Sequence, residues 1–327
     1  MIRLLAAFFM MLSSPVMASE TITIAISSAV GSAPHMQSVI LSKYLSKHMT
    51  GNPKVNVISM QGAGGIVVNN WLYNIADQQN TIATTSWNGN SILHGLTGNP
   101  QVKYDVSKFK YLFATNDGEN GVFAIWASNR NGLTSIQQMR EKGNPFVFGD
   151  QGTNENNIVN FMMTKVLKME SKIVYGYKST HKAILGGEID ARFGTLLGTV
   201  IQYPEWLKPG HEIQAIAQVG TKKRNPLIPN APLFDEFVTD PDHQKVLDLF
   251  DEMMEVNRPY YGGPGMKPGR VKQFADAARK IPNDPEWIED MKRLEGGSSV
   301  QFMQHEEMIK IMNDIISTDK KILDLIK

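Results

Sequence analysis

The sequence has 327 residues, with 33 Lys and Arg against 32 Asp and Glu, and it contains no cysteine. Without cysteine the chain forms neither disulfide bonds nor thiolate metal sites, so its stability depends on an ordinary hydrophobic core. The balanced charge excludes the strongly basic class of nucleic-acid-binding proteins, because the longest basic run is Lys222-Lys223-Arg224. The length is sufficient for two lobes.

The first 18 residues have the pattern of a secretory signal. Arg3 supplies a positive charge, residues 4–12 form an apolar run, and residues 13–18 end in Val16-Met17-Ala18. The apolar run is about half of the roughly 20 residues that a membrane-spanning helix needs. We therefore predict cleavage after Ala18 and a periplasmic protein, with a retained N-terminal anchor as the alternative. Removal of Arg3 leaves equal numbers of basic and acidic residues.

The first third of the chain alternates strands and helices. Polar and apolar residues alternate over 21–26, and strands are also predicted from Val55 to Val57 and over 81–85. Apolar residues at helical spacing predict one helix from Met36 onward and a second after residue 65, in which Val67, Trp71, Leu72 and Ile75 share a face. Single helices between strands indicate βαβ units with functional loops at the carboxyl ends of the strands.

The alternation changes between residues 109 and 127. Strands are predicted over 109–114 and 122–126, and we place a crossing between two lobes in the polar loop 115–121. A second set of units follows, with helices at 135–142, 156–167 and 180–185 and strands at 146–148, 173–177, 191–194 and 213–218. Pro226, Pro229 and Pro232 mark the return crossing, before helices near 242–255, 269–279, 285–294 and 306–326. Lobe 1 is therefore expected to contain residues 19–120 and 226–327, and lobe 2 residues 121–225.

The common catalytic and cofactor motifs are incomplete in this sequence. Gly62-Ala63-Gly64 begins like a dinucleotide-binding motif, but Val67 stands at the third glycine position. His305-Glu306 lacks the second histidine of a zinc motif, and no two histidines have ligand spacing. We expect no cofactor, no metal and no enzymatic activity, although a catalytic triad assembled by folding remains an alternative.

Five segments spread along the chain match a known family more specifically than the incomplete motifs above. They are residues 51–65 with Asn70-Trp71-Leu72-Tyr73-Asn74, residues 104–109, residues 148–154, residues 186–191 and residues 223–232. In this order they resemble the signature, the P-Y-D-P-x-K-D-F segment, the ligand loop, the G-G-x-V-D-A turn and the R-x-P-x-x-P-D-V-P segment of one family. That family is the tripartite tricarboxylate transporter receptors, also called Bug-type or TctC-type binding proteins.

The resemblance implies an α/β fold of the Venus flytrap kind, type II-like, with two mixed sheets flanked by helices and a ligand held between two lobes. It also implies capture of a small organic acid or polar metabolite and delivery to membrane permease subunits. A periplasmic sensor subunit and an enzyme acting on a small organic acid are the alternatives. We expect a monomer that binds no nucleic acid.

In lobe 1 the loop after the first strand is the leading candidate for ligand contact. A loop that leads into a helix offers unpaired N–H groups and the positive end of the helix dipole. Ser28, Ser32 and His35 lie in this region. The family usually has Asp where this chain has His35, and a histidine is able to donate to an anion, so the exchange favours a carboxylate or a neutral polar ligand.

Two further loops of lobe 1 supply candidates. Ala63 and Gly64 allow close approach of the backbone to a ligand, although a tight turn needs glycine for conformational reasons alone. Trp87 and Asn88 follow a strand and are candidates for an apolar wall and a polar contact, with a core tryptophan as the alternative.

In lobe 2 the candidates are Gln151, Gly152, Thr153 and Asn154 in one loop, followed by Thr180, His181, Arg192 and Thr195. The neutral loop precedes a helix and suits a carboxylate, with simple helix capping as the alternative. Asp150 and Glu155 flank this loop, so either their side chains point to solvent or the ligand is not a simple dianion. Arg192 suits bidentate pairing with a carboxylate, unless strand alternation directs its side chain away from the ligand.

Overall fold

The computed structural model describes residues 20–85, 88–116, 121–132, 134–141, 146–150, 158–169, 171–177, 179–294 and 300–327. The predicted signal, residues 1–18, lies outside these ranges. Among the helices described, none combines the length and the apolar character needed to cross a membrane.

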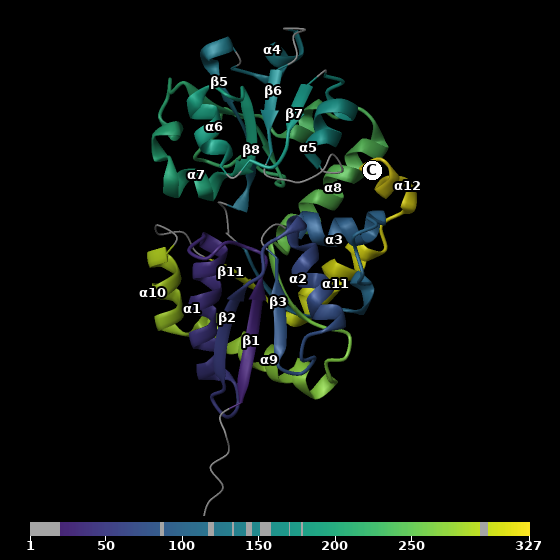
Figure 1. Ribbon diagram of the computed structural model, residues 1–327. Helices are drawn as coiled ribbons and strands as arrows, with labels where there is room; N and C mark the ends of the chain where they lie inside the picture. The colour runs from purple at the N-terminus through teal and green to yellow at the C-terminus, as the bar shows by residue number, and fades with distance from the viewer. Residues whose placement is uncertain are drawn as a thin grey trace, which may run out of the picture.

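The chain forms two α/β lobes that lie one above the other (Figure 1). Lobe 1, the lower one, has the strand order β11-β4-β10-β3-β1-β2, and lobe 2 has the order β7-β6-β8-β5-β9. The strands of lobe 1 are β1 (Thr21–Ile26), β2 (Lys54–Ser59), β3 (Thr81–Thr84), β4 (Lys110–Asn116), β10 (Arg258–Gly262) and β11 (Gln301–Met303). Those of lobe 2 are β5 (Phe123–Ser128), β6 (Phe146–Gly149), β7 (Ser171–Val174), β8 (Ala191–Thr195) and β9 (Ile213–Val219). Both sheets combine parallel and antiparallel pairs, which confirms the predicted two-lobed fold with mixed sheets.

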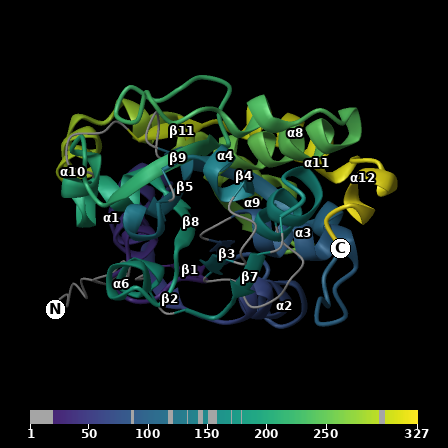
Figure 2. The ribbon, with the colours of Figure 1, turned by 90° about the horizontal axis from the view of Figure 1, so that it is seen from above.

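Helices cover both sheets. Lobe 1 has α1 (Ala33–His48), α2 (Ile66–Asn74), α3 (Asn88–Thr97), α9 (Pro268–Lys280), α10 (Pro285–Leu294), α11 (His305–Ile316) and α12 (Lys320–Asp324). Lobe 2 has α4 (Ile136–Glu141), α5 (Ile158–Phe161) with the π-helical turn η5 (Met162–Val166), α6 (Thr180–Gly186) and α7 (Leu196–Gln202), followed by the short helix η6 (Pro204–Leu207). Seen from above, lobe 2 covers much of lobe 1 (Figure 2).

Helix α8 (Pro241–Glu255) lies at the junction of the lobes (Figure 1). It packs against α3, α11 and α12 of lobe 1. On its other side Phe250 contacts the rings of Phe123 and Phe193 in lobe 2, with ring centroids 6.0 and 6.2 Å apart. The helix therefore joins the hydrophobic cores of both lobes.

Strand β1 is apolar along most of its length because helices cover both faces of its sheet. Ile22, Ile24 and Ile26 share one core with Leu41 of α1, whereas Ala25 belongs to the core on the opposite face. Such a buried central strand fixes the register of its neighbours, so the loops after β1, β2 and β3 all emerge at the same edge.

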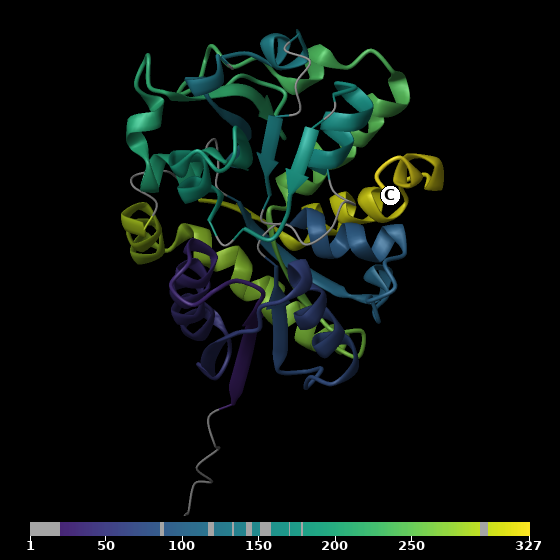
Figure 3. The same ribbon diagram turned by 45° about the horizontal axis from the view of Figure 1, so that its top comes forward.

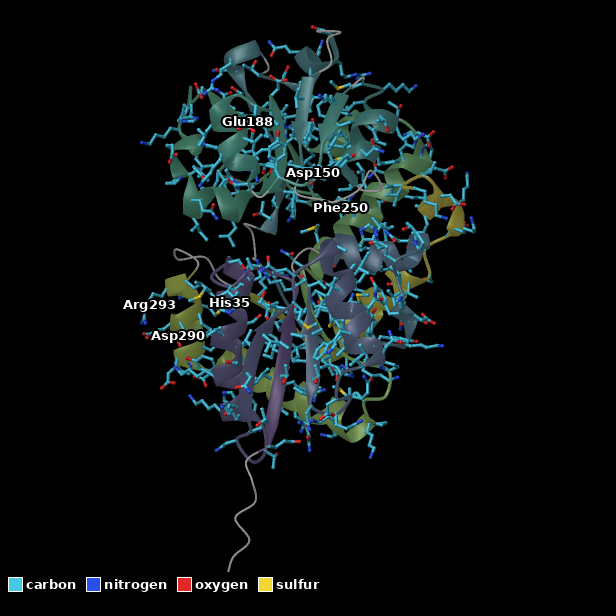
Figure 4. The ribbon with its side chains drawn as sticks, viewed as in Figure 1. His35, Asp150, Glu188, Phe250, Asp290 and Arg293 are labelled. Carbon is cyan, nitrogen blue, oxygen red and sulfur yellow. The ribbon has the colours of Figure 1, made fainter. Side chains whose placement is uncertain are left out.

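The carboxyl edges of the two sheets face one another. The arrows of β6 and β7 point toward lobe 1 (Figure 3), and β1 and its parallel neighbours run toward lobe 2 (Figure 1). His35, at the start of α1, and Asp150, directly after β6, lie on the facing sides of the two lobes (Figure 4). The loops expected to contact a ligand therefore belong to edges that face each other.

Several predicted elements need correction. Strand β10 was not predicted, because Pro259 is unusual inside a sheet, yet β10 pairs with both β3 and β4. The predicted helix 306–326 is divided into α11 and α12, since Asp319 caps a new helix by accepting a hydrogen bond from the Lys321 N–H at 2.7 Å. Helices α3 and α7 and strand β11 were also missed.

The predicted face of α2 is correct for Leu72 and wrong for Val67 and Ile75. Val67 and Ile75 are 43% and 75% exposed, while Ile66, Val68 and Leu72 are buried. The reason is the turn before the helix, where the side chain of Val67 folds back over Gly62. A Cβ atom on Gly62 would lie 2.8 Å from Val67 Cγ2.

Candidate functional site

The loop after β1 places three predicted residues at the start of α1. Ser28 is 9% exposed, and its carbonyl oxygen accepts a hydrogen bond from Ser59 Oγ at 2.6 Å. Ser32 is the N-cap residue, but its hydroxyl donates to the Ala29 carbonyl instead of capping the helix. Within the described part of the chain, Ser28 Oγ and His35 Nδ1 are buried without a hydrogen-bond partner. The first turn of α1 carries no acidic residue, so this end of the 16-residue helix is electrostatically suited to an anion.

The turn after β2 is built by backbone conformation. Residues 62–65 have φ values of 139°, 45°, 59° and 97°, a run of left-handed or extreme conformations that favours glycine. Ala63 has a side chain and lies in the left-handed region, at a cost on the order of 1–3 kcal/mol. A Cβ atom on Gly65 would lie 2.9 Å from Thr85 Cγ2. Conformation therefore accounts for Gly64 and Gly65, and ligand contact by Ala63 and Gly64 stays a prediction.

Part of the predicted site lies outside the described residues. This applies to Trp87, Gln151, Gly152, Thr153, Asn154 and Glu155. The backbone of Asn88 begins α3, but its side chain is not among those described.

Arg192 is a buried arginine on β8. It is 3% exposed, and its Nε donates a hydrogen bond to Thr180 Oγ1 at 2.9 Å. Thr180 is itself fully buried, at the first position of α6. A Cβ atom on Gly194 would lie 2.6 Å from Cζ and 2.8 Å from Nη1 of Arg192. The side chain therefore bends along β8 over Gly194, toward the carboxyl edge that faces lobe 1.

The charge of Arg192 is not balanced by a carboxylate in the part of the chain that the structure describes. None of the ion pairs formed there includes Arg192, and its Nη1 has no hydrogen-bond partner. Burial lowers the pKa of the guanidinium to about 9, which leaves it cationic at neutral pH. Burying an unpaired cation costs free energy, and an anion that pairs with the guanidinium would offset this cost.

His181 and its aromatic neighbours lie beside the guanidinium. The imidazole stacks on Tyr203, with centroids 4.7 Å apart, and contacts Trp206 at 5.5 Å. Burial, together with the positive charge of Arg192, lowers the pKa of His181 to about 3, so this histidine is neutral at physiological pH. Trp126 pairs with Arg192 across strands β5 and β8 and contacts Trp206 at 5.7 Å. Arg192 is therefore the cation of this group of side chains.

Thr195 ends β8 and caps α7. Its Oγ1 accepts a hydrogen bond from the Gly198 N–H at 3.1 Å. The structure thus brings Thr180, His181 and Arg192 together and gives Thr195 a capping role, while direct ligand contact by each stays a prediction. Ser28, Ser32 and His35 lie at the facing edge of lobe 1.

Sequence reasoning missed Trp126, Tyr203 and Trp206 as members of this group. Trp126 was assigned to a strand, but its pairing with Arg192 joins positions 66 residues apart, and neither position carries a motif. The alternation of two strands would identify this pair only once their register is known.

Several solved structures resemble almost the whole of this chain. No protein-family profile matches the sequence, and no curated protein matches it significantly. Among solved structures, MatC from Rhodopseudomonas palustris with bound malate is similar with a TM-score of 0.66 and 13% identity, covering 96% of this chain and 100% of that one.

Two further solved structures are similar. A TctC solute-binding protein from Polaromonas has a TM-score of 0.62 and 13% identity, with 94% and 98% of the two chains covered. An R. palustris protein solved with adipate has a TM-score of 0.64 and 12% identity, with 94% and 97% covered. These identities show the fold alone: the chain has the two-lobed fold of TctC-type and Bug-type periplasmic binding proteins.

Proposed function

We propose that this chain is a periplasmic solute-binding protein of the tripartite tricarboxylate transporter receptor family. It captures a small carboxylate-bearing metabolite between its lobes and delivers it to membrane permease subunits. The observation that carries the proposal is the buried Arg192, cationic and without an anionic partner among the described residues, near the edge of lobe 2 that faces lobe 1.

A carboxylate is the anion that matches this arginine. Capture of a metabolite at micromolar strength requires a net binding free energy of about 8 kcal/mol. Hydrogen bonds to charged groups contribute about 1.5–3 kcal/mol each, and pairing a cation that is already desolvated avoids part of the usual cost. The start of α1, with Ser28, Ser32 and His35, supplies polar groups for the other end of the ligand.

The remaining predicted contacts complete this site. Ala63, Gly64, Trp87 and Asn88 line it from lobe 1, and Gln151, Gly152, Thr153, Asn154 and Thr195 line it from lobe 2. In this arrangement Thr180 orients Arg192 through its hydroxyl, since it is itself fully buried. The ligand stabilises the closed arrangement of the lobes through its higher affinity for that state, and no bond of the ligand is changed.

The boundaries and the location belong to the same proposal. Residues 1–18 are removed on export after Ala18. Residues 19–120 with 226–327 form lobe 1 and residues 121–225 form lobe 2, and the mature protein acts as a monomer. The positions of the two sheets along the chain agree with crossings between β4 and β5 and between β9 and β10.

The proposal is tested with protein purified from the periplasm without refolding. Native mass spectrometry identifies any metabolite that remains bound. A thermal-shift screen follows, in which malate and adipate are the first probes because two similar structures contain them. Citrate, aromatic acids and neutral amides complete the panel. We expect at least one acid to raise Tm in proportion to the logarithm of its concentration. A folded protein whose Tm responds to none of these acids would contradict carboxylate capture.

A further inference from the structure

Lobe 2 contains a cluster of buried nitrogen atoms that lack hydrogen-bond partners among the described residues. They are Trp126 Nε1, His181 Nε2, Arg192 Nη1 and Trp206 Nε1, which we call the donor cluster. Trp126, Arg192 and Trp206 are 0%, 3% and 2% exposed. Buried polar groups in folded proteins are almost always paired, so four buried, unpaired nitrogens on neighbouring side chains require an explanation.

The four side chains form one contiguous group. Trp126 and Arg192 are direct neighbours on adjacent strands, so they lie on the same face of the sheet. Trp206 contacts the rings of both Trp126 and His181. Helix α6 begins at Thr180, whose hydroxyl accepts a hydrogen bond from Arg192 Nε at 2.9 Å, and His181 is the next residue of this helix.

The cluster offers hydrogen-bond donors in excess of acceptors. Arginine and tryptophan nitrogens donate and do not accept. One acceptor, Thr180 Oγ1, is already used by Arg192 Nε. Because His181 is neutral at physiological pH, the group carries a single positive charge. A donor-rich site with one positive charge matches one acceptor group with one negative charge, since a second buried negative charge would be unpaired.

We propose that the donor cluster binds one singly charged carboxylate, so that the ligand enters lobe 2 by a monocarboxylate end. This inference rests on the proposed function, because the ligand is the same one. In this inference, the side chains of Arg192, Trp126 and Trp206 select for a singly charged carboxylate at this end of the ligand. Sulfate and other dianionic groups are excluded from this end of the site.

Tryptophan fluorescence tests the inference directly, because two indoles belong to the cluster. Wild-type protein is titrated at constant ionic strength with acetate, adipate, sulfate and chloride. We expect acetate and adipate to change the emission, sulfate and chloride to have no effect, and W206F to lose most of the response. Equal effects of chloride and acetate would indicate an adventitious ion only. No response to acetate or adipate would show that the cluster binds no carboxylate. Either result overturns the inference.

Arg192→Met separates a binding role from a structural one. Methionine replaces the unpaired charge by an apolar chain of similar length, so we expect an equal or higher Tm in the absence of acids. We also expect at least a 100-fold loss of affinity for the acid that the thermal screen identifies. Arg130→Met is the matched control on lobe 2, because Arg130 is exposed and pairs with Glu212 at 2.6 Å. It should leave the acid affinity unchanged.

The outcomes distinguish the two proposals. If an acid binds wild type and R192M equally, the donor cluster is not its binding site, while carboxylate capture stands. A lower Tm of R192M together with unchanged acid binding assigns Arg192 a structural role and overturns the inference. If wild type binds none of the acids, the proposed function itself fails.

Discussion

The substitution Gly194→Ala tests whether the guanidinium of Arg192 lies over Gly194. The new Cβ would lie 2.6 Å from Cζ and 2.8 Å from Nη1 of Arg192, well inside van der Waals contact, so the guanidinium must move. Overpacking of this kind costs about 1–3 kcal/mol. Gly194 lies in strand β8 and has no positive φ, so its backbone accepts alanine without strain. Without the clash, the substitution should stabilise the protein by about 0.4–1 kcal/mol, because alanine restricts the unfolded chain.

The sign of the effect therefore depends on Arg192. In wild type, Gly194→Ala should lower the free energy of unfolding, and in an Arg192→Ala background it should raise it. Urea denaturation of the four proteins of this double-mutant cycle, monitored by far-ultraviolet circular dichroism, gives the coupling free energy. We expect a coupling of about 1–3 kcal/mol, the cost of the clash alone, because the gain from restricting the unfolded chain is the same in both backgrounds and cancels. The same effect of Gly194→Ala in both backgrounds would refute the placement of the guanidinium over Gly194.

Three further predictions concern the framework of lobe 1. Gly65→Ala should be more destabilising than Gly31→Ala by about 1–3 kcal/mol in urea denaturation, because both have positive φ but a Cβ at Gly31 meets no atom within 4 Å; equal costs would contradict the packing around Gly65. The Lys47 ammonium, 2.8 Å away, lowers the pKa of Asp284 from 3.8 to about 2, so its stabilising contribution is full above pH 3.8 and is lost as the pH falls toward 2. Asp284→Asn should flatten the pH dependence of Tm in this window, and an unchanged slope would count against the ion pair. Phe113→Ala, which removes a fully buried ring between two other aromatic rings, should cost about 3–5 kcal/mol, and a cost below 1 kcal/mol in urea denaturation would be inconsistent with this core.

Most elements were predictable because local patterns determine them. Strand β1 lies at the six residues at which it was predicted, and the second half of α1 buries Leu41, Tyr44 and Leu45. Strand β10 was not predictable in the same way. Its pairing with β3 and β4 is long-range, and Pro259, which lacks an N–H donor, argues locally against a strand. The face of α2 was mispredicted at Val67 because the glycine turn, and not the apolar pattern, orients this side chain.

The candidate site likewise combines features that the local sequence predicts with features that depend on tertiary contacts. The sequence identifies Arg192 as a residue near a strand end, but not the direction of its side chain, which is determined by the space that Gly194 leaves. The neutrality of His181 follows from burial and from the charge of Arg192 nearby, neither of which is encoded locally. Trp206 joins the cluster through the path of the chain after α7.

The central place of β10 in the lobe 1 sheet constrains the order in which the protein folds. All five strands of lobe 2 come from one continuous stretch, between residues 123 and 219, so this lobe can assemble from contiguous sequence. In lobe 1, β3 and β4 are separated by β10, and Tyr260 pairs with Thr84 across 176 residues. A chain that ends before Arg258 has the strands of lobe 1 in two disconnected pieces. Lobe 1 must therefore complete its sheet late, after nearly four-fifths of the chain has been synthesised, whereas lobe 2 is able to fold first.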